Sequence, residues 1–211
     1  MGTRFLPYGQ EEKQDRSNIE EIKKEYSKVD HDWLLLHHQI SFALVVFAML
    51  CECAAGVILF HYDLISISVQ RYVYKYVVLP SAANLAFIVL ETVVVRSEKI
   101  SQIKKIYTVS LTYVAISFVL YTVHCVFPAM YYTFAGAIML TIIYARYRVT
   151  VVTAVVGIGC FVFSEFFTEW DPDKVNALSD SSRMGNVLTA LFVLLAFSAV
   201  CMVTIRFEKE R

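Results

Sequence analysis

The chain has 211 residues, no net formal charge at neutral pH and a mean hydropathy of +0.55. Hydrophobic residues make up 57% of it and charged residues only 18%, whereas soluble domains carry about 25% charged residues. This composition excludes a soluble globular domain, and the balanced charge gives no indication of nucleic-acid binding. A helix needs about 20 apolar residues to cross a bilayer, and several such runs predict an all-α integral membrane protein embedded in a lipid bilayer.

The first 39 residues are polar and precede every apolar run. Residues 1–16 are predicted to be a mobile segment. The pattern Ser17-x-x-Glu20 is typical of a capping box, which starts a helix, and apolar residues then recur at helical spacing. We therefore expect an amphipathic helix over residues 17–39, lying on the cytoplasmic membrane surface or against a partner. Aspartates near its end could start a second helix that leads into the membrane.

Six apolar runs follow and predict a transmembrane domain over residues 40–205. The third and fourth runs, like the fourth and fifth, are joined by connections so short that they must form antiparallel hairpins. The charged residues 206–211 begin a cytoplasmic helix that continues the sixth span. The expected spans are residues 40–60, 76–95, 106–127, 129–145, 149–167 and 187–205.

Lysine and arginine predict the orientation, because loops rich in them stay in the cytoplasm. Of the 19 Lys and Arg residues, fifteen lie on the side that carries both predicted termini and four lie on the other. Both termini are therefore expected in the cytoplasm, in agreement with an even number of spans. The six runs show no internal repeat of the kind found in the inverted halves of transporters.

Three acidic residues fall within the predicted spans, and two of them, Glu52 and Glu91, lie away from the outer rim. Glu52 lies past the middle of the first span, and an ionisable group at that depth is a functional-site hypothesis by default. Counting along the helices puts Asn84 and Ser81 of the second span near it, so an intramembrane polar cluster is expected. The alternative is a protonated Glu52 that only joins two helices by hydrogen bonds. Glu91 lies near the cytoplasmic end, where we expect it to snorkel or to pair with Arg96 or another basic residue.

The predicted outer rim gathers histidines, carboxylates and a tryptophan. A histidine close to carboxylates suits a proton sensor, and the same groups could hold a cation or a small ligand covered by an aromatic ring. Alternatively, these are ordinary acidic loop residues and an interfacial tryptophan. The candidate ligand-binding residues are His61, His124, Glu165, Trp170, Asp171 and Asp173.

Motifs for catalysis, metal binding and cofactor binding do not occur in the sequence. The five cysteines all fall in apolar runs, without the spacing of a zinc site, so no structural metal is expected. There is no phosphate-binding glycine-rich loop and no hydrolase or metalloprotease signature. We expect neither a cofactor nor enzymatic activity in this chain.

Several short motifs are spread over residues 25–211. They are Asp30-His31-x-Trp33, Thr108-Val109-Ser110-Leu111, Thr122-Val123-His124-x-Val126-Phe127-Pro128-Ala129, Phe163-Ser164-Glu165-x-Phe167, Trp170-Asp171-Pro172-Asp173-Lys174 and Phe207-Glu208-Lys209-Glu210. Together they resemble the six-helix membrane input regions of diguanylate cyclases of clostridia-like bacteria. The resemblance implies a homodimer in the bacterial inner membrane whose last helix controls a cytoplasmic output domain that makes cyclic di-GMP. That domain would follow the exit helix or belong to a separate protein.

The sequence therefore predicts a sensory membrane module that takes up a small ligand or a proton at its outer rim. A small transporter or channel with a midplane site at Glu52 and Asn84 is the alternative. A purely structural membrane anchor is a third possibility. Substrate flux in liposomes would separate the second class from the first, and ligand-dependent change would separate the first from the third.

Overall fold

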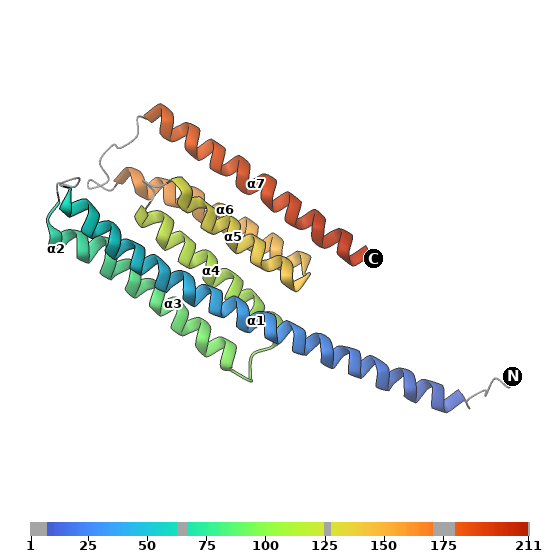
Figure 1. The fold of residues 1–211 in the computed structure, drawn as a ribbon. Coiled ribbons are helices and arrows are strands. Elements are labelled where there is room, and N and C mark those ends of the chain that lie inside the picture. Colours follow the sequence, from blue (N-terminus) through green and yellow to red (C-terminus); the bar gives the residue numbers. More distant parts are fainter. Residues whose placement is uncertain (1–7, 63–66, 125–127, 171–179, 211) are drawn as a thin grey trace.

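The computed structural model describes residues 8–62, 67–124, 128–170 and 180–210, which form a bundle of long helices (Figure 1). No strand occurs among these residues. The all-α prediction is therefore confirmed for the described part of the chain.

Five helical stretches among the described residues are long and apolar enough to cross a membrane. Each of them overlaps one of the predicted spans, which indicates a multi-pass membrane protein. The stretches are Lys28–His61, Val69–Arg96, Gln102–Val123, Tyr147–Phe166 and Gly185–Arg206. They belong to the helices α1 (Tyr8–His61), α2 (Val69–Tyr72) with α3 (Leu79–Arg96), α4 (Gln102–His124), α6 (Tyr147–Trp170) and α7 (Asp180–Glu210).

The segment predicted as the fourth span is shorter than the others. It consists of the 3-10 helix η2 (Pro128–Tyr131), the α-helix α5 (Tyr132–Leu140) and the 3-10 helix η3 (Thr141–Tyr144). Its apolar stretch, Tyr132–Tyr144, is one of the shorter apolar helices of 10–17 residues. Because a 3-10 helix rises about 2.0 Å per residue and an α-helix about 1.5 Å, residues 128–144 reach roughly 30 Å along their axis.

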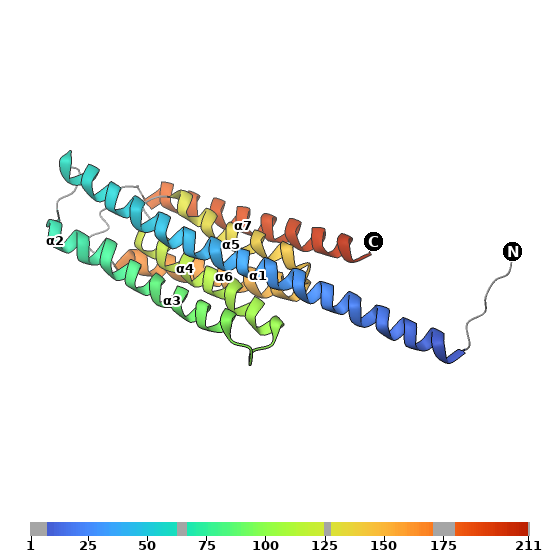
Figure 2. The same cartoon turned by 60° about the horizontal axis from the view of Figure 1, so that its bottom comes forward.

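α1 joins the predicted surface helix and the predicted first span in one helix of 54 residues. The structure therefore shows no second helix start at Asp30 or Asp32, and the helix begins at Tyr8 rather than at Ser17. Serine and aspartate inside a helix cost only about 0.5 kcal/mol each, which is too little to interrupt a helix that is already formed. The N-terminal part of α1 extends away from the bundle along the helix axis (Figures 1 and 2).

The second span begins with irregular winding. The π-helix η1 (Val73–Val78) lies between α2 and α3. Pro80 explains it, because proline has no N–H group and its ring collides with the carbonyl group four residues earlier, that of Tyr76. The wider π turn moves this carbonyl group away. On the facing side, Gly56 of α1 allows close approach, since a Cβ atom there would lie 2.7 Å from Cε1 of Tyr72.

α4 lies at the centre of the bundle and contacts α1, α3, α5 and α6. Its aromatic residues pack with phenylalanines of the neighbouring helices, and α7 closes the same core. The largest buried cluster contains Tyr113, Val114, Tyr121, Phe134, Ala135, Ala137, Phe161, Ala190 and Leu194.

The N-terminal part of α1 and the C-terminal end of α7 lie at the same end of the bundle (Figures 1 and 2). We call this end the inner end and the opposite one the outer end. α5 runs between the two ends as the long helices do, although it is shorter (Figure 1).

Candidate functional site

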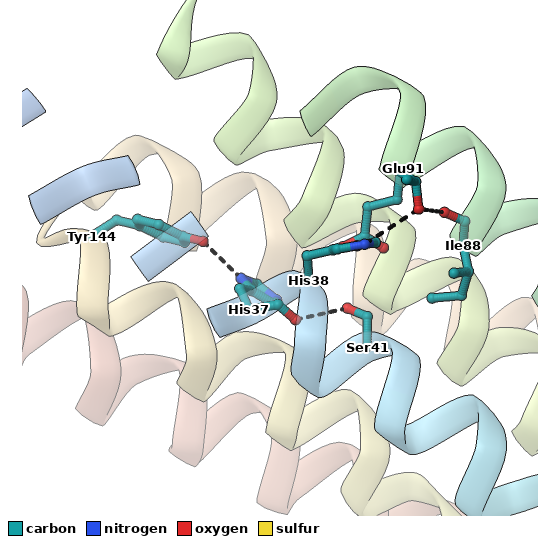
Figure 3. A network of polar contacts seen from close by, with 7 residues as sticks. His37, His38, Ser41, Ile88, Glu91 and Tyr144 are labelled. Carbon is teal, nitrogen blue, oxygen red and sulfur yellow. Dashed lines mark hydrogen bonds and ion pairs between the residues drawn. The ribbon is translucent and has the colours of Figure 1, made fainter. Parts of the chain in front are cut away.

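Two adjacent histidines of α1 meet polar side chains of α3 and η3 towards the inner end of the bundle (Figure 3). Neighbouring residues of an α-helix point about 100° apart, so the two rings face different partners. We call the group the inner histidine cluster. Its members are His37, His38 and Ser41 of α1, Glu91 and Thr92 of α3, and Tyr144 of η3.

His38 joins α1 to α3 through both of its ring nitrogens. Its Nε2 lies 3.3 Å from Oγ1 of Thr92. The Thr92 hydroxyl donates its only hydrogen to the carbonyl oxygen of Ile88, at 2.7 Å. Because this contact is the shorter of the two, we assign the hydroxyl hydrogen to Ile88, which makes Nε2 of His38 the donor to Thr92.

The other ring nitrogen of His38 faces a carboxyl group. Nδ1 lies 3.1 Å from Oε1 of Glu91, which is an ion-pair distance, although the two groups do not reach the alignment of a hydrogen bond. Glu91 has no exposed side-chain surface, whereas 19% of the His38 side chain is exposed. Of the two alternatives expected for Glu91, snorkelling does not occur, and pairing with a basic residue does, although the partner is His38 of α1 rather than Arg96.

His37 occupies the other side of α1 and is fully buried. Its Nδ1 lies 3.0 Å from the hydroxyl oxygen of Tyr144. The ring stacks on that of Tyr144 and is tilted against that of Tyr113, with 5.9 Å between centroids in both pairs. Its Nε2 is buried and has no hydrogen-bond partner among the described residues.

The charged residues around the cluster hold the helix ends together. The buried Lys105 donates from Nζ to the carbonyl oxygen of Val95, at 2.8 Å, and so binds α4 to the end of α3. Asp30 of α1 pairs with Arg146 at 2.7 Å. Arg146 follows Ala145, whose φ of 48° places it in the left-handed region at the turn between η3 and α6.

Such a group of side chains can exchange protons. Ionisable residues inside a membrane are costly and mark ion or proton pathways, and buried polar atoms without partners are rare in native proteins. The cluster contains several such atoms, on His37, His38 and Glu91. No group of three or more His, Cys, Asp and Glu side chains within the described residues could hold a metal ion.

The predicted intramembrane cluster is described only in part. Glu52 and Asn84 are both buried, with 4% and 2% of their surface exposed. The Tyr72 hydroxyl donates to the backbone carbonyl oxygen of Glu52, at 3.4 Å. A cluster of Glu52, Asn84 and Ser81 stays a prediction.

At the outer end, Glu165 of α6 accepts a hydrogen bond from the Tyr121 hydroxyl of α4. Beside this contact, the hydroxyl oxygens of Thr122 and Ser164 lie 2.7 Å apart. The same two helices carry His124 and Glu165, as the sequence predicted, but the side chain of His124 lies outside the described residues. A ligand site here stays a prediction.

The remaining rim candidates are only partly described. His61 is exposed near the end of α1, and its ring lies against that of Tyr62, with 4.9 Å between centroids. Trp170 is the last residue of α6, without a described side chain. Asp171 and Asp173 lie outside the described residues. None of these positions is brought together with Glu165 by a described contact.

Sequence reasoning missed the inner histidine cluster because it placed the first span at residue 40. His37 and His38 then belonged to a surface helix, outside the membrane. Two features of the sequence could have indicated the cluster. The two histidines directly precede an apolar run, and Glu91 lies in the neighbouring span without another buried charge partner close to it in sequence.

Comparison with known proteins gives no match: no protein-family model fits the chain, and no curated protein or solved structure is similar to it. The class of the protein follows from its fold, which is that of a multi-pass helical membrane protein.

Proposed function

We propose that the chain is the membrane input module of a bacterial signalling protein, which passes a change inside the bundle to the cytoplasm through α1 and α7. The observation that carries this proposal is the continuity of α1. One helix of 54 residues holds both histidines of the inner histidine cluster and extends beyond the bundle at the inner end. A tilt or rotation of its membrane part must therefore move the part outside.

α7 supports the same function from the other side of the core. Its buried residues Leu194, Cys201 and Ile205 face the bundle, and the sequence changes from apolar to charged at Arg206. α7 leaves the bundle at the end where α1 also extends (Figure 1). The two helices can thus act on one cytoplasmic output.

The finer features of the proposal come from the sequence. Counting α5 as a crossing gives six spans, and the distribution of Lys and Arg puts both termini in the cytoplasm. The resemblance to the input regions of diguanylate cyclases favours a homodimer in the inner membrane and an output that makes cyclic di-GMP. A small ligand or a proton at the outer rim is the proposed stimulus.

Side-chain contacts between helices provide the coupling. The Tyr121–Glu165 and Thr122–Ser164 hydrogen bonds join α4 to α6 at the outer end, and α6 in turn packs on α7. A ligand that competes for the Glu165 carboxylate would weaken the first contact and shift α6 relative to α4. Such a shift requires that the ligand bind one arrangement more tightly than the other.

A fusion protein tests this function. The chain is joined after Arg211, in helical register, to a dimeric diguanylate cyclase catalytic domain, and cyclic di-GMP production is measured in membranes. Glu165→Ala is expected to change production several-fold. Insertion of two glycines at the junction should abolish this difference, because the helix is interrupted. Equal production by the parent, Glu165→Ala and the glycine variant would contradict the proposal.

The second candidate function is a transporter, favoured by the burial of Glu52 and by the Asn84 Oδ1 atom, which is buried without a hydrogen-bond partner among the described residues. It predicts flux of a small solute or ion into liposomes that contain the purified chain. Glu52→Gln should remove that flux. Flux that persists unchanged in Glu52→Gln would remove this residue from the pathway.

A further inference from the structure

The contacts of His38 leave room for one shared proton. Nε2 carries a hydrogen when the Thr92 hydroxyl donates to Ile88, its shorter contact. Nδ1 and the Glu91 carboxyl oxygen face each other at 3.1 Å. Without a proton between them, a nitrogen lone pair would face a carboxylate inside a buried site, which is repulsive. One proton, on Nδ1 or on Oε1, turns this repulsion into attraction.

We propose that His38 and Glu91 form a proton-binding site whose loaded state holds α1 against α3. Loading adds one proton from water to Nδ1 or Oε1, and unloading returns that proton to water, with no other bond made or broken. Proton binding itself rests on the geometry of the pair. The role of proton binding as a stimulus for signalling rests on the proposed function.

The proton enters through His38 rather than Glu91. The Glu91 side chain is completely buried, whereas 19% of the His38 side chain is exposed. His38 lies eight residues, about two helical turns, from Asp30, where α1 still contacts the bundle through Arg146. Because the cluster lies towards the inner end, we expect the exchanged proton to come from the aqueous phase at that end.

The elements around the pair carry other titratable or charged groups, and most of them are already engaged. Lys105 is bound to the Val95 carbonyl oxygen, and Arg146 is bound to Asp30. Glu91 thus remains the carboxyl group in contact with His38. The surrounding groups are His37 and Asp30 of α1, Arg96 of α3, Lys105 and Tyr113 of α4, Tyr144 of η3, and Arg146 after η3; α6 contributes the apolar Val149.

The direction in which pH changes the contact between α1 and α3 follows from whether the shared proton is bound. At low pH the site is loaded and α1 is held against α3. As the pH rises, the shared proton leaves, and the contact between the two helices weakens. α1 is therefore expected to be closer to α3 at about pH 5 than at about pH 10, a range that covers histidine and buried carboxyl groups.

The test follows two quantities on the full chain in nanodiscs. Solid-state NMR of 15N-labelled histidine reports the protonation of His38. Pulsed electron paramagnetic resonance reports the distance between spin labels at Ile19 and Val93, which are exposed on α1 and α3, in a variant without the five native cysteines. The His38 Nδ1 resonance should move with pH, and the label distance should lengthen with the same midpoint.

Glu91→Gln is the decisive variant. Its side-chain amide donates an N–H group to Nδ1 at every pH, so the label distance should stay at its short, low-pH value. His31→Gln, an exposed histidine on the same end of α1, should keep the wild-type response. A pH-independent His38 resonance in the wild type would overturn the proton site, whether or not the variants fold. A pH-dependent distance that persists in Glu91→Gln would also overturn it.

The two proposals can fail separately. If His38 titrates and the label distance responds, but the fused cyclase shows no pH dependence, the proton site stands and the proposed signalling function fails.

Discussion

Substitution of Gly56 by alanine tests how α1 and the second span are packed. A Cβ atom at Gly56 would lie 2.7 Å from Cε1 of Tyr72, which is closer than carbon atoms approach. The Tyr72 ring cannot turn aside easily, because it is 5% exposed and lies between Phe60, at 5.4 Å, and Tyr76, at 5.3 Å between centroids. Its hydroxyl also donates to the carbonyl oxygen of Glu52.

Two opposing effects decide the magnitude. Overpacking of this kind costs about 1–3 kcal/mol. Alanine stabilises a helix by about 1 kcal/mol relative to glycine. Gly56→Ala should therefore lower the free energy of unfolding by up to about 2 kcal/mol. Gly159→Ala is the matched control, because no atom lies within 4 Å of its Cβ position, and it should raise the free energy by about 1 kcal/mol.

Unfolding by sodium dodecyl sulfate in mixed micelles, followed by circular dichroism, measures both variants. The expected difference between them is about 1–3 kcal/mol. Equal changes in the two variants would show that Tyr72 does not pack against Gly56, and would refute the register of α1 on the second span. Replacing Tyr72 by leucine should remove most of the penalty if the contact is the cause.

Three further predictions use the same unfolding measurement. Ala145→Gly should raise the free energy of unfolding by about 1 kcal/mol, because alanine is strained at a φ of 48°; a decrease would argue against the left-handed turn. Thr150→Val should cost about 1 kcal/mol, since it removes the buried hydrogen bond of 2.8 Å to Thr141, and Thr150→Ser, which keeps the hydroxyl, should cost less. Arg146→Ala should cost less than about 1 kcal/mol, because its ion pair with Asp30 is partly exposed to solvent; a larger loss would mean that this pair fixes the turn.

The membrane-crossing stretches could be predicted because they depend on composition over about 20 residues. The irregular turns inside these stretches could not be predicted, because they depend on contacts with particular neighbouring residues. Pro80 predicts an irregular helix but not the kind of irregularity. The structure shows that it is the π-helix η1, beside the close contact of Tyr72 with α1. The continuity of α1 was missed because a local signal such as Ser17 shows only that a helix start is favoured there. Whether the helix begins at that residue depends on the rest of the folded chain.

The candidate site was predicted less well than the fold. Glu91 was recognised as an acidic residue in a span, but its partner could not be found from the sequence, since His38 lies 53 positions away (38 to 91) and was assigned to a surface helix. Glu165 contacts α4 through Tyr121, three residues before His124. The expected approach of His124 to Glu165 stays a prediction, because the side chain of His124 lies outside the described residues.

The length of α1 outside the bundle has a mechanical consequence. From Asp30, which pairs with Arg146, to the start of the helix at Tyr8 there are 22 residues (30 minus 8), or about 33 Å of helix. A pivot of only about 5° where α1 leaves the bundle would move the far tip by roughly 3 Å, a displacement comparable to the width of a side chain. A change in the contacts of one histidine ring would thereby move the N-terminal end of α1 far enough to rearrange the contacts of a neighbouring protein domain.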